Sequence, residues 1–174
     1  IKIAYHGRLD VHRGVMSLPM ILASLHSHGV EATLHIHGTG DALERLKSIE
    51  LEGLEVTDAI PQEDLAHLLS KYDVGLLPMP EKKVWSLASP LKRSEYLACG
   101  MVVCGIDHTG HRIENSGDWL QLFSQKEFIA NTVSWIKSLD RDRLSALQQE
   151  SRTYAEENLS WAHSVDALES IILS

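Results

Sequence analysis

The stretch SPLKRSEYLACG, which begins at Ser89, combines groups that bind anions with one that binds hydroxyl groups. Ser89 can cap a helix and Pro90 suits the first helical position, so free N–H groups at Leu91 and Lys92 should point out of the helix start. The helix dipole and the Lys92 ammonium then favour a phosphate. Glu95, one turn on, could accept hydrogen bonds from a ribose diol. The spacing predicts a nucleotide site; the alternative is a solvated Lys92–Glu95 pair on an ordinary helix.

Glu95 stands among apolar neighbours on that predicted helix. Leu91 lies four residues before it, and Ala98 and Cys99 lie three and four residues after it. A helix places residues at these spacings on one face. The carboxylate therefore interrupts an apolar stripe, and spacing alone leaves open whether it faces a ligand or solvent.

Three other loops carry residues suited to a ligand. HGRLDVHRG follows the first predicted strand and places Arg8 and Arg13 around a glycine-bounded turn. HGTGD follows the second, and its Gly38 and Gly40 permit either close backbone approach to a ligand or simple turn geometry. The connection over residues 78–89 shows no evident secondary structure, and a strand–helix loop of this length usually covers a site.

The elements that must position these loops alternate between short β-type runs and longer helical patterns. This alternation is typical of an α/β fold, a Rossmann-like doubly wound parallel sheet with helices on both faces. Such sheets bind ligands at the carboxyl ends of their strands. The predicted strands are 1–5, 32–36, 54–59, 74–77, 101–105 and a weak sixth at 120–123. The predicted helices are 17–28, 41–49, 62–71 and 90–99, followed by C-terminal helices at 125–139, 141–157 and 160–173.

Composition restricts the class of protein. The 174 residues are 44% hydrophobic and 23% charged, which suits one core, so residues 1–174 are predicted to form a single domain. The formal net charge of -8 argues against nucleic acid as a partner. No apolar run approaches the roughly 20 residues of a membrane span. The chain begins directly on IKIAY without Met, which suggests a fragment of a longer protein.

The cysteines and histidines bear on location and on metal binding. Cys99 and Cys104 lie in apolar surroundings without metal-ligand spacing, which fits a reducing cytoplasm. Ten histidines require that a zinc site be considered, with His35 and His37 on one strand face as one pair. The other pair, His108 and His111, lies near the end of the fifth predicted strand; an exposed loop histidine is the simpler interpretation of His108, although it could lie near a ligand. Among the four Trp, only Trp85 in the long loop is a candidate ligand neighbour.

The chain resembles the C-terminal, donor-binding domain of GT-B retaining glycosyltransferases, the group-1 type family of mannosyl-, glucosyl- and related transferases. The resemblance rests on five segments in order: GRLDVHRG, LHIHGTGDALERL, IPQEDLAHLLSKYDVGLLPMP, SPLKRSEYLACGMVVCGID and TGHRIENSG. The closing NLSWAHSVDALESIIL is similar to the terminal helix of that family, which packs back toward an N-terminal, acceptor-binding domain. That domain is absent from this chain, so the isolated chain is expected to be inactive.

The resemblance implies roles for individual residues. Arg8 and Arg13 would bind the donor diphosphate, and Arg13 stands where the family usually has Lys. Lys92 and the backbone of Leu91 would join them, and Glu95 would hold the ribose. The catalytic contribution of Arg8, Arg13 and Lys92 would be to stabilise the leaving diphosphate.

The same resemblance implies the partners. The nucleotide base should lie against Thr57, Asp58 and Ala59, through backbone groups. The donor would be a GDP-, UDP- or ADP-sugar, and the acceptor a glycan or lipid bound by the missing domain, as in glycan or lipopolysaccharide biosynthesis. No cofactor and no metal are implied, because basic side chains and a helix terminus neutralise the diphosphate. The full-length enzyme would be cytoplasmic or attached peripherally to a membrane.

One departure from the family leaves alternatives open. A second glutamate commonly stands eight positions before the ribose-binding one and contacts the donor sugar, but here that position is Leu87. The identity of the sugar is therefore not predicted. The alternatives are a GT-B-like sugar-nucleotide epimerase, which shares the donor site, and a non-catalytic nucleotide-binding domain.

Overall fold

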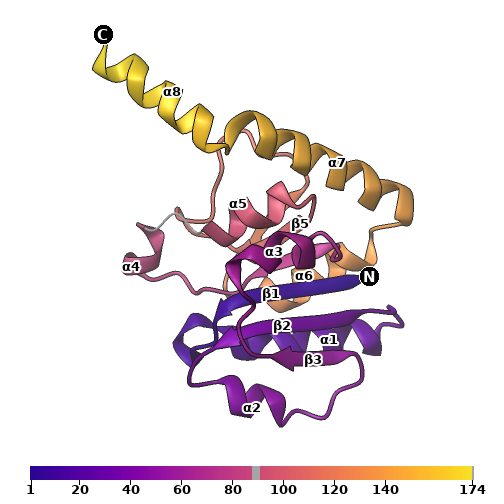
Figure 1. The fold of residues 1–174 in the computed structure, drawn as a ribbon. Coiled ribbons are helices and arrows are strands. Elements are labelled where there is room, and N and C mark those ends of the chain that lie inside the picture. Colours follow the sequence, from indigo (N-terminus) through magenta and orange to yellow (C-terminus); the bar gives the residue numbers. More distant parts are fainter. Residues whose placement is uncertain (88–90, 174) are drawn as a thin grey trace.

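The computed structural model describes residues 1–87 and 91–173, apart from the side chains of five residues in the last helix. Within this part of the chain, six parallel strands form one sheet in the order β3-β2-β1-β4-β5-β6 (Figure 1). The strands are β1 (Lys2–Arg8), β2 (Thr33–Thr39), β3 (Leu54–Thr57), β4 (Val74–Leu77), β5 (Val102–Ile106) and β6 (Leu120–Phe123). The predicted α/β doubly wound fold is confirmed.

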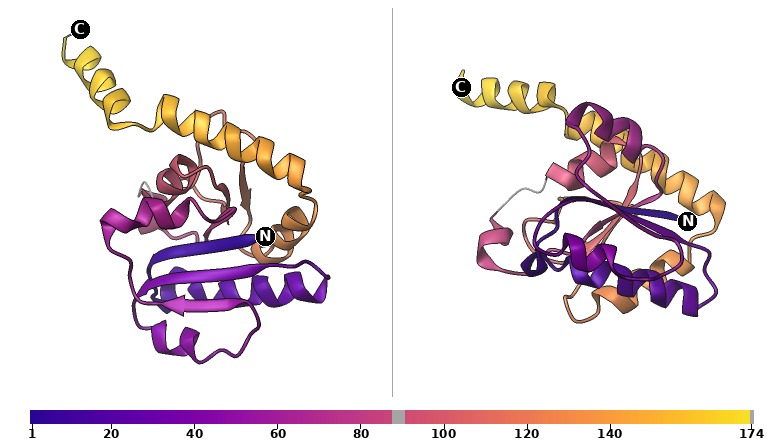
Figure 2. Two further views of the ribbon diagram at one scale, coloured as in Figure 1. Left: turned by 45° about the vertical axis from the view of Figure 1, so that its right-hand side comes forward. Right: turned by 60° about the horizontal axis from the view of Figure 1, so that its bottom comes forward.

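Helices cover both faces of this sheet. Helices α1 and α6 pack together on one face, and α5 and α7 pack together on the other, with α3 beside them (Figure 2). The α-helices are α1 (Leu18–Ser27), α2 (Leu43–Lys47), α3 (Gln62–Leu69), α4 (Lys83–Ser86), α5 (Leu91–Ala98), α6 (Phe128–Lys137), α7 (Arg141–Asn158) and α8 (Trp161–Ile172). Two short 3-10 helices, η1 (Val11–Arg13) and η2 (Val15–Ser17), precede α1.

The central strands explain why the sheet is buried. Every residue of β4 and β5 is buried, as expected for parallel strands that are covered on both faces. Helix α5 can cover β4 only because residue 75 is glycine: a Cβ there would come within 2.3 Å of the Tyr96 ring of α5. The missing side chain lets α5 lie close on β4, with Tyr96 fully buried between them.

Several predicted boundaries differ from the structure. Strand β1 continues to Arg8 and β2 to Thr39, because each pairs with its neighbour along this whole length. Strand β3 ends at Thr57, so Asp58 and Ala59 follow the strand. The prediction that the 78–89 connection lacks secondary structure is wrong, because α4 forms within it.

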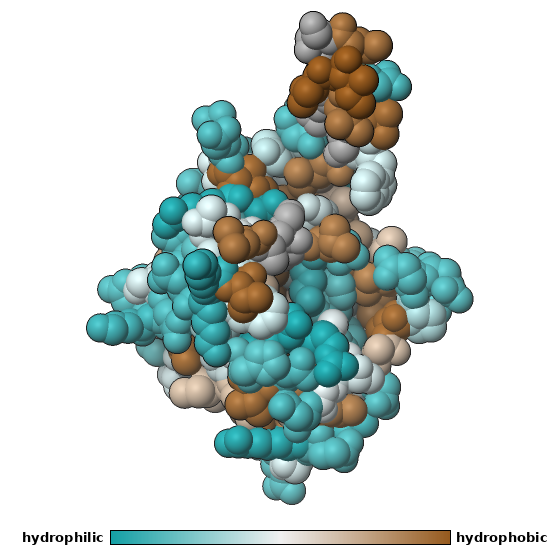
Figure 3. All heavy atoms as spheres, turned by 90° about the vertical axis from the view of Figure 1, so that its left-hand side faces the viewer, coloured by the Kyte–Doolittle hydropathy of each residue, from teal (hydrophilic) through white to brown (hydrophobic). Residues whose placement is uncertain are grey.

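Helix α8 extends away from the body of the domain (Figures 1 and 2). Its apolar side chains gather on the projecting end of the molecule in Figure 3. Those with exposed side chains include Trp161, Val165, Leu168 and Ile172, which are 50–83% exposed. Their spacing of four, three and four residues places them on one face of the helix. In the described part of the chain, every helix is too short or too polar to cross a membrane.

Candidate functional site

The candidate residues meet where the order of the strands reverses. Strand β1 is paired with β2 on one side and with β4 on the other, so the loops after β1 and β4 diverge to opposite faces. Open α/β sheets bind ligands at such a reversal, beyond the carboxyl ends of the strands. Arg8 and Arg13 come from the loop after β1, and Lys92 and Glu95 come from α5, which follows β4. The structure therefore brings these residues from two distant parts of the chain to one edge of the sheet.

Lys92 reaches across this edge to the end of β1. A Cβ on Gly7 would lie 2.6 Å from Lys92 Cε and 2.8 Å from its Nζ, so the lysine stem rests on that glycine. Gly7 has a φ of +112°, a conformation that favours glycine. The Nζ lies 5.7 Å from the centre of the Tyr5 ring. Burial is the main cause that lowers the pKa of Lys92, with the nearby Arg13 charge acting in the same direction.

Arg8 and Arg13 share one carboxylate, which the sequence analysis did not single out. Asp10 is 7% exposed, and its Oδ1 accepts a hydrogen bond from Arg8 at 3.0 Å. Its Oδ2 accepts from the Nε of Arg13 at 3.3 Å. The hydrogen bond from Arg8 is the main cause that lowers the pKa of Asp10. The carboxylate thereby orients both guanidinium groups, and the two arginines together leave a net positive charge at this edge.

Trp85 connects the long loop to the same site. The guanidinium carbon of Arg13 lies 4.6 Å from the centre of a Trp85 ring, and the His12 ring stacks on the indole at 6.1 Å. Arg13 also reaches Met79 at the start of this loop, with 3.8 Å between Nη1 and Sδ. The segment that carries α4 is thus held against η1, beside the predicted diphosphate site.

Glu95 makes a contact that the sequence did not reveal. Its Oε2 lies 3.1 Å from the Nε2 of His6 on β1, and the two side chains are 30% and 12% exposed. The contact with His6 is the main cause that lowers the pKa of Glu95, and the Lys92 charge contributes in the same direction. Glu95 is therefore an ionised, partly exposed carboxylate close to the end of β1.

The apolar stripe expected around Glu95 does not include a buried Leu91. Leu91 is 69% exposed, because α5 turns Tyr96 and Leu97 toward the sheet instead. Ala98 and Cys99 pack partly against the core. The predicted cap and first-turn residues, Ser89 and Pro90, lie outside the described residues.

The predicted base-binding loop begins where β3 ends. Thr57 is half-buried, and its Oγ1 lies 2.7 Å from the Nδ1 of His37. Asp58 and Ala59 are exposed, and Asp58 forms an ion pair with Lys47 at 3.3 Å. The Thr57 side chain is thus engaged with the protein, and the exposed stretch after it remains available to a ligand.

Close packing explains why residues 38 and 40 are glycines. A Cβ on Gly38 would lie 1.8 Å from the carbonyl oxygen of Gly7, and one on Gly40 would lie 2.4 Å from the backbone of Leu9. The two glycines let β2 and its loop approach the loop after β1. Contact with a ligand at these positions stays a prediction.

The expectation that His108 is an exposed loop histidine is wrong. His108 is 2% exposed and His111 is fully buried, with ring centres 3.7 Å apart. The Nδ1 of His111 lies 2.7 Å from the carbonyl oxygen of Ile106, and burial lowers its pKa to about 4. Both rings are covered because the loop after β5 folds back over the end of the strand.

Arg93, another residue that sequence reasoning missed, holds that loop. It is 8% exposed, and its Nη1 donates to the carbonyl oxygens of Gly110 and Arg112 at 3.1 and 2.8 Å. The available signal in the sequence was the position of Arg93, three and four residues before Tyr96 and Leu97, which places a cation on the apolar face of the helix. Leu87, which replaces the family's second glutamate, is 81% exposed. Within residues 1–87 and 91–173, no group of three or more His, Cys, Asp or Glu side chains could hold a metal ion.

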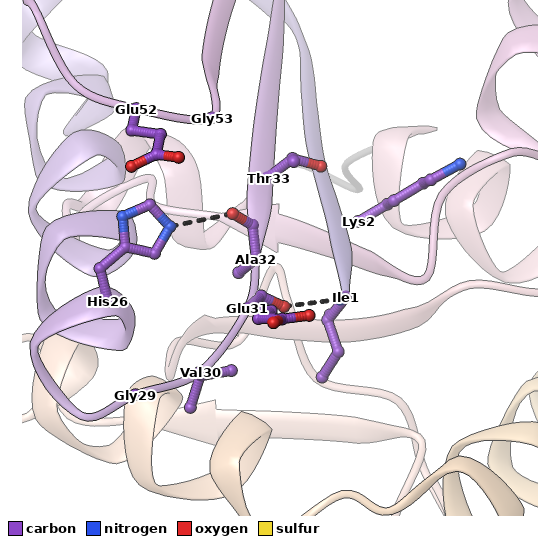
Figure 4. Close-up of a pocket in the computed structure, with 10 residues that line it drawn as sticks. All are labelled: Ile1, Lys2, His26, Gly29, Val30, Glu31, Ala32, Thr33, Glu52 and Gly53. Carbon is purple, nitrogen blue, oxygen red and sulfur yellow. Dashed lines mark hydrogen bonds between the residues drawn. The ribbon is translucent and has the colours of Figure 1, made fainter.

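A separate cavity of about 720 Å³ lies at the opposite edge of the sheet (Figure 4). It is lined by residues at the start of β1 and β2, and by His26, Glu52 and their neighbours. His26 already contacts the carbonyl oxygen of Ala32 at 2.9 Å, and the Ile1 ammonium donates to the carbonyl oxygen of Glu31 at 2.9 Å. None of the predicted site residues lines this cavity, so it is separate from the predicted nucleotide site.

The fold and these side chains define an α/β domain with a cationic site at the reversal point of its sheet. Residues 1–138 match the family described as Glycosyl transferases group 1. The chain belongs to this family, which confirms the predicted family. No curated protein sequence matches the chain significantly.

Solved glycosyltransferase structures share the fold. The pneumococcal O-GlcNAc transferase GtfA, in complex with UDP and GlcNAc, is 18% identical with a TM-score of 0.71 over 90% of this chain and 32% of GtfA. TarM of S. aureus is 12% identical with a TM-score of 0.77, over 99% of this chain and 35% of TarM. The C-terminal domain of a group 1 family protein (LpcC) from Francisella tularensis is 12% identical with a TM-score of 0.63, over 92% of this chain and 86% of that domain. The chain thus spans about a third of the length of GtfA and TarM.

Proposed function

We propose that this chain is the nucleotide-sugar donor-binding domain of a retaining glycosyltransferase, which transfers a hexose to an acceptor hydroxyl. The observation that carries the proposal is the convergence of three cations and one ionised carboxylate at the reversal point between β1 and β4. Arg8, Arg13 and Lys92 suit a diphosphate, and Glu95 suits a ribose diol. Among the structural relatives, GtfA was solved with UDP and GlcNAc, and Anabaena HepE with UDP-glucose.

The cations would act on the leaving group. When the bond between the sugar and the diphosphate breaks, negative charge develops on the phosphate oxygens. The diphosphate of the intact donor is already anionic, and fixed cations and a helix N-terminus stabilise the additional charge of the leaving diphosphate more strongly than the smaller charge of the ground state. Lys92 in the first turn of α5 and the arginines held by Asp10 supply these groups from two sides.

The acceptor hydroxyl would be delivered by another domain of the full-length protein. The relationship to the C-terminal domain of LpcC supports a C-terminal position for this chain. The exposed apolar face of α8, formed by Trp161, Val165, Leu168 and Ile172, would pack against the acceptor domain (Figure 3). We take retention of the anomeric configuration and a hexose of the mannosyl or glucosyl type from the resemblance to the family.

Titration calorimetry of the 174-residue chain tests the proposal. UDP, GDP, ADP and inorganic pyrophosphate are compared, and at least one nucleoside diphosphate should bind more tightly than pyrophosphate. At 100 times its dissociation constant, that ligand should also raise the free energy of unfolding by about 2.7 kcal/mol. No binding of any of the four ligands would count against a donor site.

A second measurement separates this proposal from its alternatives. The full-length protein is incubated with radiolabelled sugar nucleotides and candidate glycan and lipid acceptors. Label transferred to an acceptor supports the glycosyltransferase. Conversion of the sugar nucleotide into an epimer without transfer would indicate an epimerase, and binding alone would indicate a non-catalytic domain.

A further inference from the structure

We propose that His6 is a positioning residue for ribose recognition: it holds one carboxylate oxygen of Glu95 so that the carboxylate is oriented before the diol arrives. The inference rests on the proposed function and deepens it, because it assigns a second residue to the same ribose site. His6 itself would not contact the reacting atoms.

The geometry of the pair is set by two elements that are far apart in the chain. His6 lies on β1 and Glu95 lies on α5, and their closest atoms, Nε2 and Oε2, are 3.1 Å apart. With 12% of its side chain exposed, His6 is largely covered, whereas Glu95 keeps 30% of its side chain exposed. The contact uses one oxygen of the carboxylate from the protein side, and the Gln62 side chain of α3 also acts on this carboxylate in the direction that favours its ionised form. A carboxylate has about four acceptor positions, so these two contacts leave acceptor capacity for a diol.

Tyr96, the neighbour of Glu95 in sequence, fixes the histidine ring. The edge of one ring meets the face of the other, with centres 5.3 Å apart and planes at 86°. The backbone N–H of His6 also donates to the Tyr96 hydroxyl at 3.2 Å. Since Tyr96 is fully buried against β4, α5 controls both the carboxylate and the imidazole that holds it.

An oriented carboxylate binds a diol better than a mobile one, for two reasons. A glutamate side chain that is already ordered loses less conformational freedom when the ligand binds. The histidine contact also favours the ionised carboxylate, and only the ionised form offers both oxygens purely as acceptors.

Other titratable groups lie close to this pair and must be considered in any pH experiment. His37 faces His6 from β2, and burial lowers its pKa. Tyr96 contacts His6 from α5, and burial raises its pKa far above the physiological range. Lys92, one turn before Glu95, adds a positive charge that favours the carboxylate. None of these groups is altered in the variants below.

The first test compares the variants His6→Ala and His6→Gln by calorimetry, with two probes. One probe is the nucleoside diphosphate among UDP, GDP and ADP that binds most tightly, and the other is inorganic pyrophosphate. His6→Ala should weaken nucleotide binding about 3- to 10-fold, because the Glu95 side chain must then be ordered when the ligand binds. Its pyrophosphate affinity should not change, because pyrophosphate has no ribose. His6→Gln retains an N–H donor and should recover most of the nucleotide affinity at neutral pH.

His35→Ala is the matched control. His35 lies on β2, and its Nδ1 is 3.0 Å from a carboxylate oxygen of Glu55, so it also forms a histidine–glutamate contact. In the sheet, His35 is level with Ala4, two residues further from the carboxyl end of the strands than His6. Its loss should leave both affinities unchanged. Thermal unfolding of every variant shows whether the fold is retained, and His6→Gln keeps the test informative if His6→Ala does not fold.

A double-mutant cycle separates positioning from a merely structural role. If His6 acts through Glu95, His6→Ala should have no further effect on nucleotide affinity in a Glu95→Gln background. The pH profile is the second readout. From about pH 7 to about pH 4.5, the ratio of nucleotide to pyrophosphate affinity should fall more in His6→Ala than in the unaltered chain, because Glu95 becomes easier to protonate.

The outcomes distinguish the two proposals. Additive effects in the cycle, or equal losses for nucleotide and pyrophosphate, would overturn the role of His6. If Glu95→Gln weakens nucleotide binding and His6→Ala does not, the ribose site stands and the positioning role falls. If no nucleoside diphosphate binds the unaltered chain, the proposed function fails and the role of His6 fails with it.

Discussion

Replacing Lys92 by Met should weaken diphosphate binding by about 10- to 150-fold. The change keeps most of the apolar stem that rests on Gly7 and removes the ammonium. A hydrogen bond to a charged group contributes roughly 1.5–3 kcal/mol, and each 1.4 kcal/mol is tenfold in affinity. The full loss is expected because, among the described residues, no carboxylate forms an ion pair with Lys92 within 4.0 Å. Its charge is available to a ligand.

The pH dependence of binding gives an independent check on Lys92. Burial and Arg13 lower its pKa below the ordinary lysine value of 10.5, so the free protein loses this proton at a lower pH than an exposed lysine would. Diphosphate affinity should therefore decline as the pH rises toward 10.5. Lys92→Met should lack that alkaline decline.

Calorimetry with pyrophosphate and a nucleoside diphosphate measures both effects. Lys137→Met, on the exposed surface of α6 across the sheet, is the control for an equal change in net charge. Lys92→Met should weaken both ligands alike, because the phosphate contact is common to them. A folded Lys92→Met protein with unchanged pyrophosphate affinity would refute the assignment of this lysine to the diphosphate.

The remaining predictions concern acid stability, metal and turnover. The pKa of Asp10 is lowered chiefly by Arg8, so its stabilising effect is present above pH 3.8 and is lost as the pH falls through its lower folded value. In urea unfolding, the free energy of unfolding of Asp10→Asn should accordingly fall less on acidification than that of the unaltered chain. An equal fall in the two proteins would contradict this. The free energy of unfolding should also fall from pH 6.5 to about 4, because the unfolded chain takes up a proton that buried His111 does not. A His111→Gln variant with an equally steep fall would disprove that cause. Nucleotide affinity should be the same in excess EDTA, and a loss that Mg²⁺ or Mn²⁺ restores would argue for a metal. The purified 174-residue chain should bind a nucleoside diphosphate without transferring sugar, and repeated turnovers to an added acceptor would show otherwise.

Much of the fold was predictable because local patterns agree with the tertiary structure. The bounds predicted for β4 and β6 from their apolar runs agree with the structure, and the bounds predicted for β5 differ from the structure by one residue. Boundaries failed where strand pairing added polar residues. Strand β1 includes His6, Gly7 and Arg8 because they pair with β2 in register, and no hydrophobic pattern marks such residues as strand.

The sequence by itself determined which residues carry charge at the strand ends, and hence the prediction of an anion site. Five segments in order gave the resemblance to the family, and that resemblance implied the roles of Arg8, Arg13, Lys92 and Glu95. These inferences need no knowledge of contacts, because the carboxyl ends of parallel strands always share one edge of the sheet.

Only the tertiary structure decided which side chains act on these candidates. His6 and Glu95 are far apart in the chain, and their contact exists because Gly75 admits Tyr96 and so brings α5 onto the end of β1 and β4. Burial of His108 likewise depends on how the loop after β5 folds back. Sequence spacing specifies neighbours within one helix or strand, whereas partners on different elements are set by how those elements pack.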